Sequence, residues 1–139
     1  MTTQEMVAEL NKALASEYQA VVMYNTYAAM VRGPYRPQLK QFFEKEIPDE
    51  LGHAQFLAEK VGALGGYPTV EPKEVPRASD PQEMLRNVRD AEQEAIRMYK
   101  KLAEAAHELG DLGLANKLED IAQDETGHFE ETEKILSGW

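Results

Sequence analysis

The pentapeptide Asp-Glu-x-Gly-His occurs twice in this chain, at residues 49–53 and 124–128. Each copy places a glutamate three residues before a histidine, and residues three apart lie on the same face of a helix. The copies therefore offer two oxygen–nitrogen ligand pairs, Glu50 with His53 and Glu125 with His128. Carboxylates and imidazoles are ligands that divalent metals accept. Metal binding is the chemistry that this repeat predicts.

The repeat extends beyond the pentapeptide. The two copies are 75 residues apart, and the same offset relates Glu17 to Glu92 and Tyr24 to Tyr99. This regularity indicates a duplicated helical hairpin that carries one set of ligands in each half.

Glycine and proline divide the chain into four long segments with helical periodicity. The last two links are unequal: a proline-rich stretch over residues 67–79 joins the second and third segments, whereas a single glycine separates the third and fourth. The long link can cross the whole bundle and place the third helix parallel to the second. We therefore predict one all-α domain over residues 1–139, a four-helix bundle in up-down-down-up order, with helices at about 3–31, 37–64, 79–109 and 111–136.

Glutamates and histidines interrupt the apolar stripes of these four helices. A buried carboxylate costs several kcal/mol unless it is compensated, and no lysine or arginine accompanies these residues on their stripes. Two divalent ions would balance four carboxylates. We predict a dimetal site in which Glu50 and Glu125 bridge the ions; its complete ligand set is Glu17, Glu50, His53, Glu92, Glu125 and His128.

The ligand types narrow the choice of metal ion. Carboxylate-rich sites without thiolates suit Fe(II) or Mn(II), and Zn(II) also binds them. Tyr24 and Tyr99 lie two helical turns beyond Glu17 and Glu92 on the same stripes. They are either core aromatics whose hydroxyl groups form hydrogen bonds, or donors of a hydrogen bond or an electron to the metal centre.

Composition excludes several classes of function. The net charge of −10 argues against binding nucleic acid or anionic membranes. The absence of cysteine excludes disulfides, thiolate metal sites and iron–sulfur clusters. The first residues do not resemble a secretory signal, and no stretch reaches the length of a membrane span. We expect a cytoplasmic protein.

The motif set resembles the ferritin-like di-iron carboxylate superfamily, and bacterioferritin most closely. Besides the six ligands, Leu10-Asn11-Lys12 ahead of Glu17 and the 33-residue steps from Glu17 to Glu50 and from Glu92 to Glu125 carry this resemblance. It implies two iron ions per chain, oxidation of Fe(II) with dioxygen or hydrogen peroxide, and a homo-oligomer that is at least a dimer. It also implies a tyrosine beside the centre at Tyr24.

Three positions depart from bacterioferritin. Leu51 replaces the methionine that ligates haem in that family, so no haem is expected. Eleven residues follow His128, too few for the short fifth helix of 24-subunit cages, so ferroxidase chemistry is expected more strongly than storage in a shell. Glu131 occupies the position of an expected tryptophan.

Two alternatives remain. A rubrerythrin-like di-iron peroxidase would share the fold, but rubrerythrins usually carry an extra glutamate where this chain has Ala95. The other alternative is a helical scaffold that binds metal without catalysis.

Overall fold

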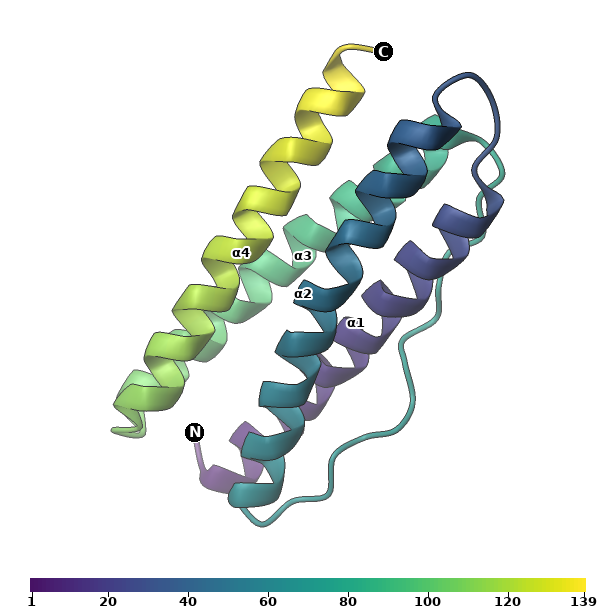
Figure 1. Ribbon diagram of the computed structural model, residues 1–139. Helices are drawn as coiled ribbons and strands as arrows, with labels where there is room; N and C mark the ends of the chain where they lie inside the picture. The colour runs from purple at the N-terminus through teal and green to yellow at the C-terminus, as the bar shows by residue number, and fades with distance from the viewer.

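The computed structural model describes residues 1–139 and contains four long α-helices (Figure 1). The predicted bounds hold to within two residues at every helix end, and the prediction of an all-α four-helix bundle is confirmed. The helices are α1 (Thr3–Met30), α2 (Arg36–Ala63), α3 (Pro81–Glu108) and α4 (Leu112–Ser137).

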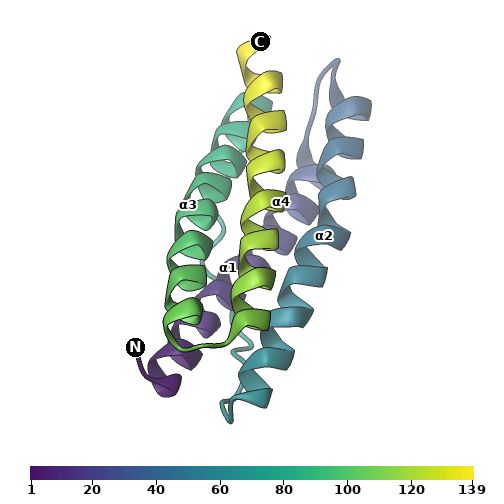
Figure 2. The same ribbon diagram turned by 90° about the vertical axis from the view of Figure 1, so that its left-hand side faces the viewer.

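The helices form two antiparallel hairpins, α1–α2 and α3–α4, and α1 also packs against α3. Figure 2 shows the two hairpins side by side. The linker over residues 64–80 runs along the outside of the bundle from the end of α2 to the opposite end, where α3 begins (Figure 1). Because of this crossing α3 runs parallel to α2, which gives the predicted up-down-down-up order.

Local sequence explains where the helices begin and end. The side chains of Asp80 and Asp111 accept hydrogen bonds from backbone N–H groups in the first turns of α3 and α4, which satisfies donors that have no partner within the helix. Gly65 and Gly110 follow the ends of α2 and α3 with φ of +88° and +78°. A left-handed residue at that position is the usual way to stop a helix, and glycine adopts it without steric cost.

The apolar core is divided into two clusters along the bundle. One surrounds Leu14, Leu57 and Leu118, and the other surrounds Phe43, Leu85 and Val88. Between them lies a layer of buried polar side chains. None of the four helices combines the length and apolarity that crossing a bilayer requires.

Candidate metal centre

Each helix contributes one predicted glutamate ligand to this polar layer, and all four are buried. The exposed fractions of the four residues are 2–4%, and the residues are Glu17, Glu50, Glu92 and Glu125. Each glutamate interrupts the apolar stripe of its helix, as the sequence analysis predicted. The bundle geometry therefore brings four carboxyl groups from distant parts of the chain to one level.

Four of the six predicted ligands form a tight cluster. One ligand atom each from Glu17, Glu50, His53 and Glu125 lies within 4.8 Å of the others. The Nδ1 atom of His53 lies 3.2 Å from Glu125 Oε1 and 3.5 Å from Glu17 Oε2. Two oxygens and one nitrogen thus face a common point from three helices.

His128 and Glu92 form the other half of the layer more loosely. The Nδ1 atom of His128 lies 3.1 Å from Glu50 Oε1 and 3.9 Å from Glu125 Oε1. Glu92 lies outside the tight cluster, and its carboxylate accepts hydrogen bonds from Thr132 at 2.9 Å and from Tyr24 at 3.1 Å. Glu125 Oε1 therefore lies near the Nδ1 atoms of both histidines, whereas Glu50 Oε1 lies near that of His128.

The donor set fits divalent metal ions. Six buried side-chain atoms have no hydrogen-bond partner: Glu17 Oε2, Glu46 Oε2, Glu50 Oε1, His53 Nδ1, Glu125 Oε1 and His128 Nδ1. Five of them belong to predicted ligands. An unpaired polar atom in the interior is costly, and two cations would accept lone pairs from these oxygens and nitrogens. The assignment of individual ligands stays a prediction.

Burial and crowding control the protonation of the carboxyl groups. Burial raises the pKa of Glu50 well above its ordinary value, and the carboxylates of Glu125 and Glu17 raise it further. Burial likewise raises the pKa of Glu125, and it raises that of Glu92 to about 8.

The pKa values of the two imidazoles are also raised, but for a different reason. Burial by itself would lower the pKa of His53, but the neighbouring carboxyl groups of Glu125 and Glu17 raise it to about 11. Glu46 and Glu125 overcome burial in the same way at His128 and raise its pKa to about 9. Without metal the layer therefore retains protons at neutral pH. A metal ion must displace these protons, so its binding strengthens as pH rises.

Three carboxylates that contact the distal nitrogens of the histidines were not predicted from the sequence. Nε2 of His53 lies 3.0 Å from Asp124, and Nε2 of His128 lies 3.3 Å from Asp49 and 2.6 Å from Glu46. Each aspartate belongs to the opposite copy of the pentapeptide. A carboxylate on the second nitrogen fixes the orientation and tautomer of a metal-binding imidazole.

The signals for these residues were present in the sequence. The aspartates open the very pentapeptide that was identified, and Glu46 lies one turn before Glu50 on the same face of α2. Glu46 is as buried as the predicted ligands, at 3% exposed.

Each of the two tyrosines donates a hydrogen bond to a glutamate of the other helical hairpin. Tyr24 donates to Glu92, and Tyr99 donates to Glu17 Oε1 at 2.5 Å. Burial, followed by the nearby carboxylates, raises the pKa of both phenols well above the ordinary value, so both remain protonated donors. The structure places both side chains beside predicted ligands, and their role in chemistry stays a prediction.

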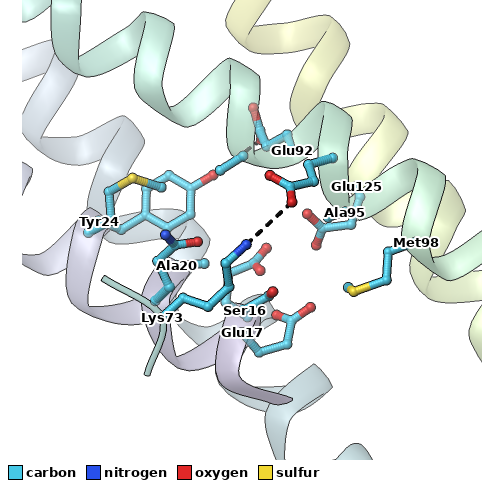
Figure 3. A pocket seen from close by; sticks show the side chains of 14 residues that line it. Ser16, Glu17, Ala20, Tyr24, Lys73, Glu92, Ala95, Met98 and Glu125 are labelled. Atoms are coloured by element: carbon cyan, nitrogen blue, oxygen red, sulfur yellow. Dashed lines mark hydrogen bonds and ion pairs between the residues drawn. The ribbon is translucent and has the colours of Figure 1, made fainter. Parts of the chain in front are cut away.

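A small cavity connects the carboxylate layer with the surface between α1 and α3 (Figure 3). It encloses about 30 Å³, enough for a molecule the size of one or two waters. All four glutamates line it. In Figure 3 the Lys73 side chain reaches over the cavity from the linker, and the dashed line from its ammonium marks the ion pair with Glu94.

Comparison with known proteins identifies the family. The Ferritin model, described as a ferritin-like domain, matches residues 7–138. The chain belongs to the ferritin-like family. The match spans α1 to α4 and therefore includes every residue of the polar layer.

Several relatives support this membership. A crystal structure of a ferritin-like, di-iron-carboxylate protein from Bacillus anthracis is 48% identical, with a TM-score of 0.95 over 98% of this chain and 99% of that one. Bacterioferritin from Rhodobacter capsulatus is 25% identical over 96% of this ferritin-like chain and 83% of its own length. A nutrient stress-induced DNA-binding protein from Synechococcus is 26% identical over 86% of this chain and 73% of its own. The resemblance to the ferritin-like superfamily is therefore confirmed.

Proposed function

We propose that this protein is a non-haem di-iron ferroxidase that oxidises Fe(II) to Fe(III) with dioxygen or hydrogen peroxide. The observation that carries the proposal is the convergence of unpaired carboxylate and imidazole atoms from α1, α2 and α4 on one buried layer. The 48% identity to a di-iron-carboxylate protein supports iron as the metal.

The six predicted ligands divide into two sets. Glu17 and His53 would hold one ion, Glu92 and His128 would hold the other, and Glu50 and Glu125 would lie between the two. Iron supplies the electrons: each of two Fe(II) ions loses one electron, and the oxidant takes up both together with two protons. Dioxygen then gives hydrogen peroxide, and hydrogen peroxide gives two waters.

The protein itself positions ligands and excludes bulk water. Tyr24 and Tyr99 hold Glu92 and Glu17 in place through hydrogen bonds. The aspartates on the distal nitrogens orient both imidazoles. The two apolar clusters close the layer from both ends of the bundle, so electrostatic interactions within it are weakly screened.

An aerobic Fe(II) titration tests the proposal. We expect two irons per chain and rapid oxidation in the wild type, and loss of both in Glu50→Ala and His128→Ala. Glu44→Ala and His107→Ala are matched controls, because both residues are exposed and lie on α2 and α3. Unchanged oxidation in the ligand variants would refute the assignment.

The same titration separates the two alternatives. Peroxide reduction that outpaces net iron oxidation in the presence of a reductant would favour the rubrerythrin-like peroxidase. Two bound irons without oxidation would favour the non-catalytic scaffold.

A further inference from the structure

The linker between α2 and α3 is fixed along one face of α1. Its hydrogen bonds to α1 occur at positions separated by four or eight residues, which follow one stripe of the helix. They are Asn11 Nδ2 to Tyr67 O (3.1 Å), Thr69 N to Asn11 Oδ1 (2.9 Å), Lys73 N to Ala15 O (3.0 Å), Gln19 Nε2 to Glu74 O (2.6 Å) and Tyr27 OH to Pro76 O (2.5 Å). The linker is therefore an ordered strap.

Two of these bonds define the place of Lys73. Its own N–H donates to Ala15, and the carbonyl of the next residue, Glu74, accepts from Gln19. The Lys73 backbone is thus held between two consecutive turns of α1. From this position its side chain reaches over the mouth of the cavity (Figure 3).

The lining of the cavity includes one basic side chain, Lys73, paired with the exposed carboxylate of Glu94. Ala20 on α1 and Ala95 on α3 line the cavity with small side chains that leave it open. Lys73 is the only basic residue in its lining. Its partner Glu94 is 70% exposed and 3.3 Å away, and such a surface ion pair is weak enough to open readily.

Charge at the mouth selects what can enter once metal is bound. Two divalent ions would neutralise the four carboxylates, so once the ion pair with Glu94 opens, the Lys73 ammonium would be the free charge at the mouth of the cavity. It would repel a further cation and attract an anion or a small hydrogen-bond acceptor. The cavity volume limits such a molecule to a few atoms.

Building on the proposed function, we propose that this opening between α1 and α3 admits the small oxygen-bearing oxidant and that Lys73 is the positioning residue that attracts and holds it. Lys73 acts through charge and a hydrogen bond donated by its ammonium group, and it forms no bond to metal.

Azide binding to Co(II)-loaded protein tests this without relying on turnover. Azide is a small anion, and its binding to cobalt changes the visible absorption. We expect Lys73→Gln to weaken azide binding about fivefold to tenfold at low salt, the effect of removing one unit charge a few ångströms away. Lys73→Arg should restore most of the azide affinity, and the number of bound Co(II) ions should stay at two per chain in both variants.

Lys40→Gln is the matched control, because Lys40 is 42% exposed against 44% for Lys73 and also pairs with one exposed glutamate. Equal azide affinity in the wild type and Lys73→Gln would overturn the inference, and so would an equal loss in Lys40→Gln. Failure of the wild type to bind two Co(II) ions per chain would instead contradict the proposed function.

Discussion

The aspartates that support the two histidines predict an asymmetry between the two metal positions. Asp124 and Asp49 are alike in exposure, at 58% and 60%, and each contacts the distal nitrogen of one histidine. His53 has Asp124 alone at that nitrogen, whereas His128 has both Asp49 and the buried Glu46. Replacing the aspartates one at a time by asparagine removes equivalent charges from unequal surroundings.

The expected losses of metal affinity follow from this difference in the carboxylates around the two histidines. Removing a carboxylate behind a metal-binding imidazole typically lowers metal affinity about 10- to 100-fold. We expect that loss for Asp124→Asn, and at only one of the two ions. Asp49→Asn should lower affinity by less than about threefold, because the Glu46 carboxylate still lies 2.6 Å from His128 Nε2 as an ion-pair partner. The double variant Glu46→Gln/Asp49→Asn should lose as much as Asp124→Asn.

Competitive Zn(II) titration against a chromogenic chelator resolves the two affinities, and circular dichroism verifies that each variant keeps its helices. Equal losses in the two single variants would refute the reasoning, since they would mean that Glu46 does not substitute for Asp49. A larger loss in Asp49→Asn would refute it as well. Zn(II) avoids redox chemistry, so the result is independent of ferroxidase activity.

Three further predictions concern stability. Between pH 6.5 and 8 the folded, metal-free protein retains protons on Glu92 and His53, whose pKa values are raised to about 8 and about 11, while the unfolded chain releases them. The free energy of unfolding should therefore fall as pH rises, by about 1.4 kcal/mol per pH unit for each such proton. A melting temperature that rises over this window would contradict the prediction. Leu118→Ala should lower the free energy of unfolding by about 2–5 kcal/mol, because Leu118 is fully buried; urea denaturation measures this, and a loss below about 1 kcal/mol would show that the site repacks. Tyr27→Phe removes the hydrogen bond to Pro76 that helps to fix the strap. Losing this bond should destabilise the docked strap by about 1 kcal/mol and speed proteolytic cleavage within residues 64–80 about fivefold without changing helical content. Unchanged cleavage would show that the other strap contacts suffice.

Much of the fold could be predicted because it depends on local signals. Glycine and proline mark the helix ends to within two residues, and spacings of three and four residues assign side chains such as Glu17 and Glu125 to buried faces. The proline-rich link is long enough to cross the bundle, which distinguishes this topology from a simple up-and-down arrangement. These features require no knowledge of how the helices pack.

The contacts between helices could not be predicted from the same signals. Periodicity shows which face of a helix is buried, but the axial register between α2 and α4 is set by packing of the whole bundle. That register places Asp124 against His53, and Asp49 and Glu46 against His128. It also makes each tyrosine donate to the glutamate of the other half rather than to its own.

The sequence by itself determined which residue types reach the interior: four carboxylates, two imidazoles and two phenols on otherwise apolar stripes. Tertiary structure decided which atoms meet, and it brought in residues that no helical stripe contains. Lys73 is the clearest case, because it lies in an irregular linker and reaches the cavity only through the hydrogen bonds that fix the strap along α1. Helical periodicity is a property of neighbouring residues, whereas these contacts join residues far apart in the chain and depend on the packing of all four helices.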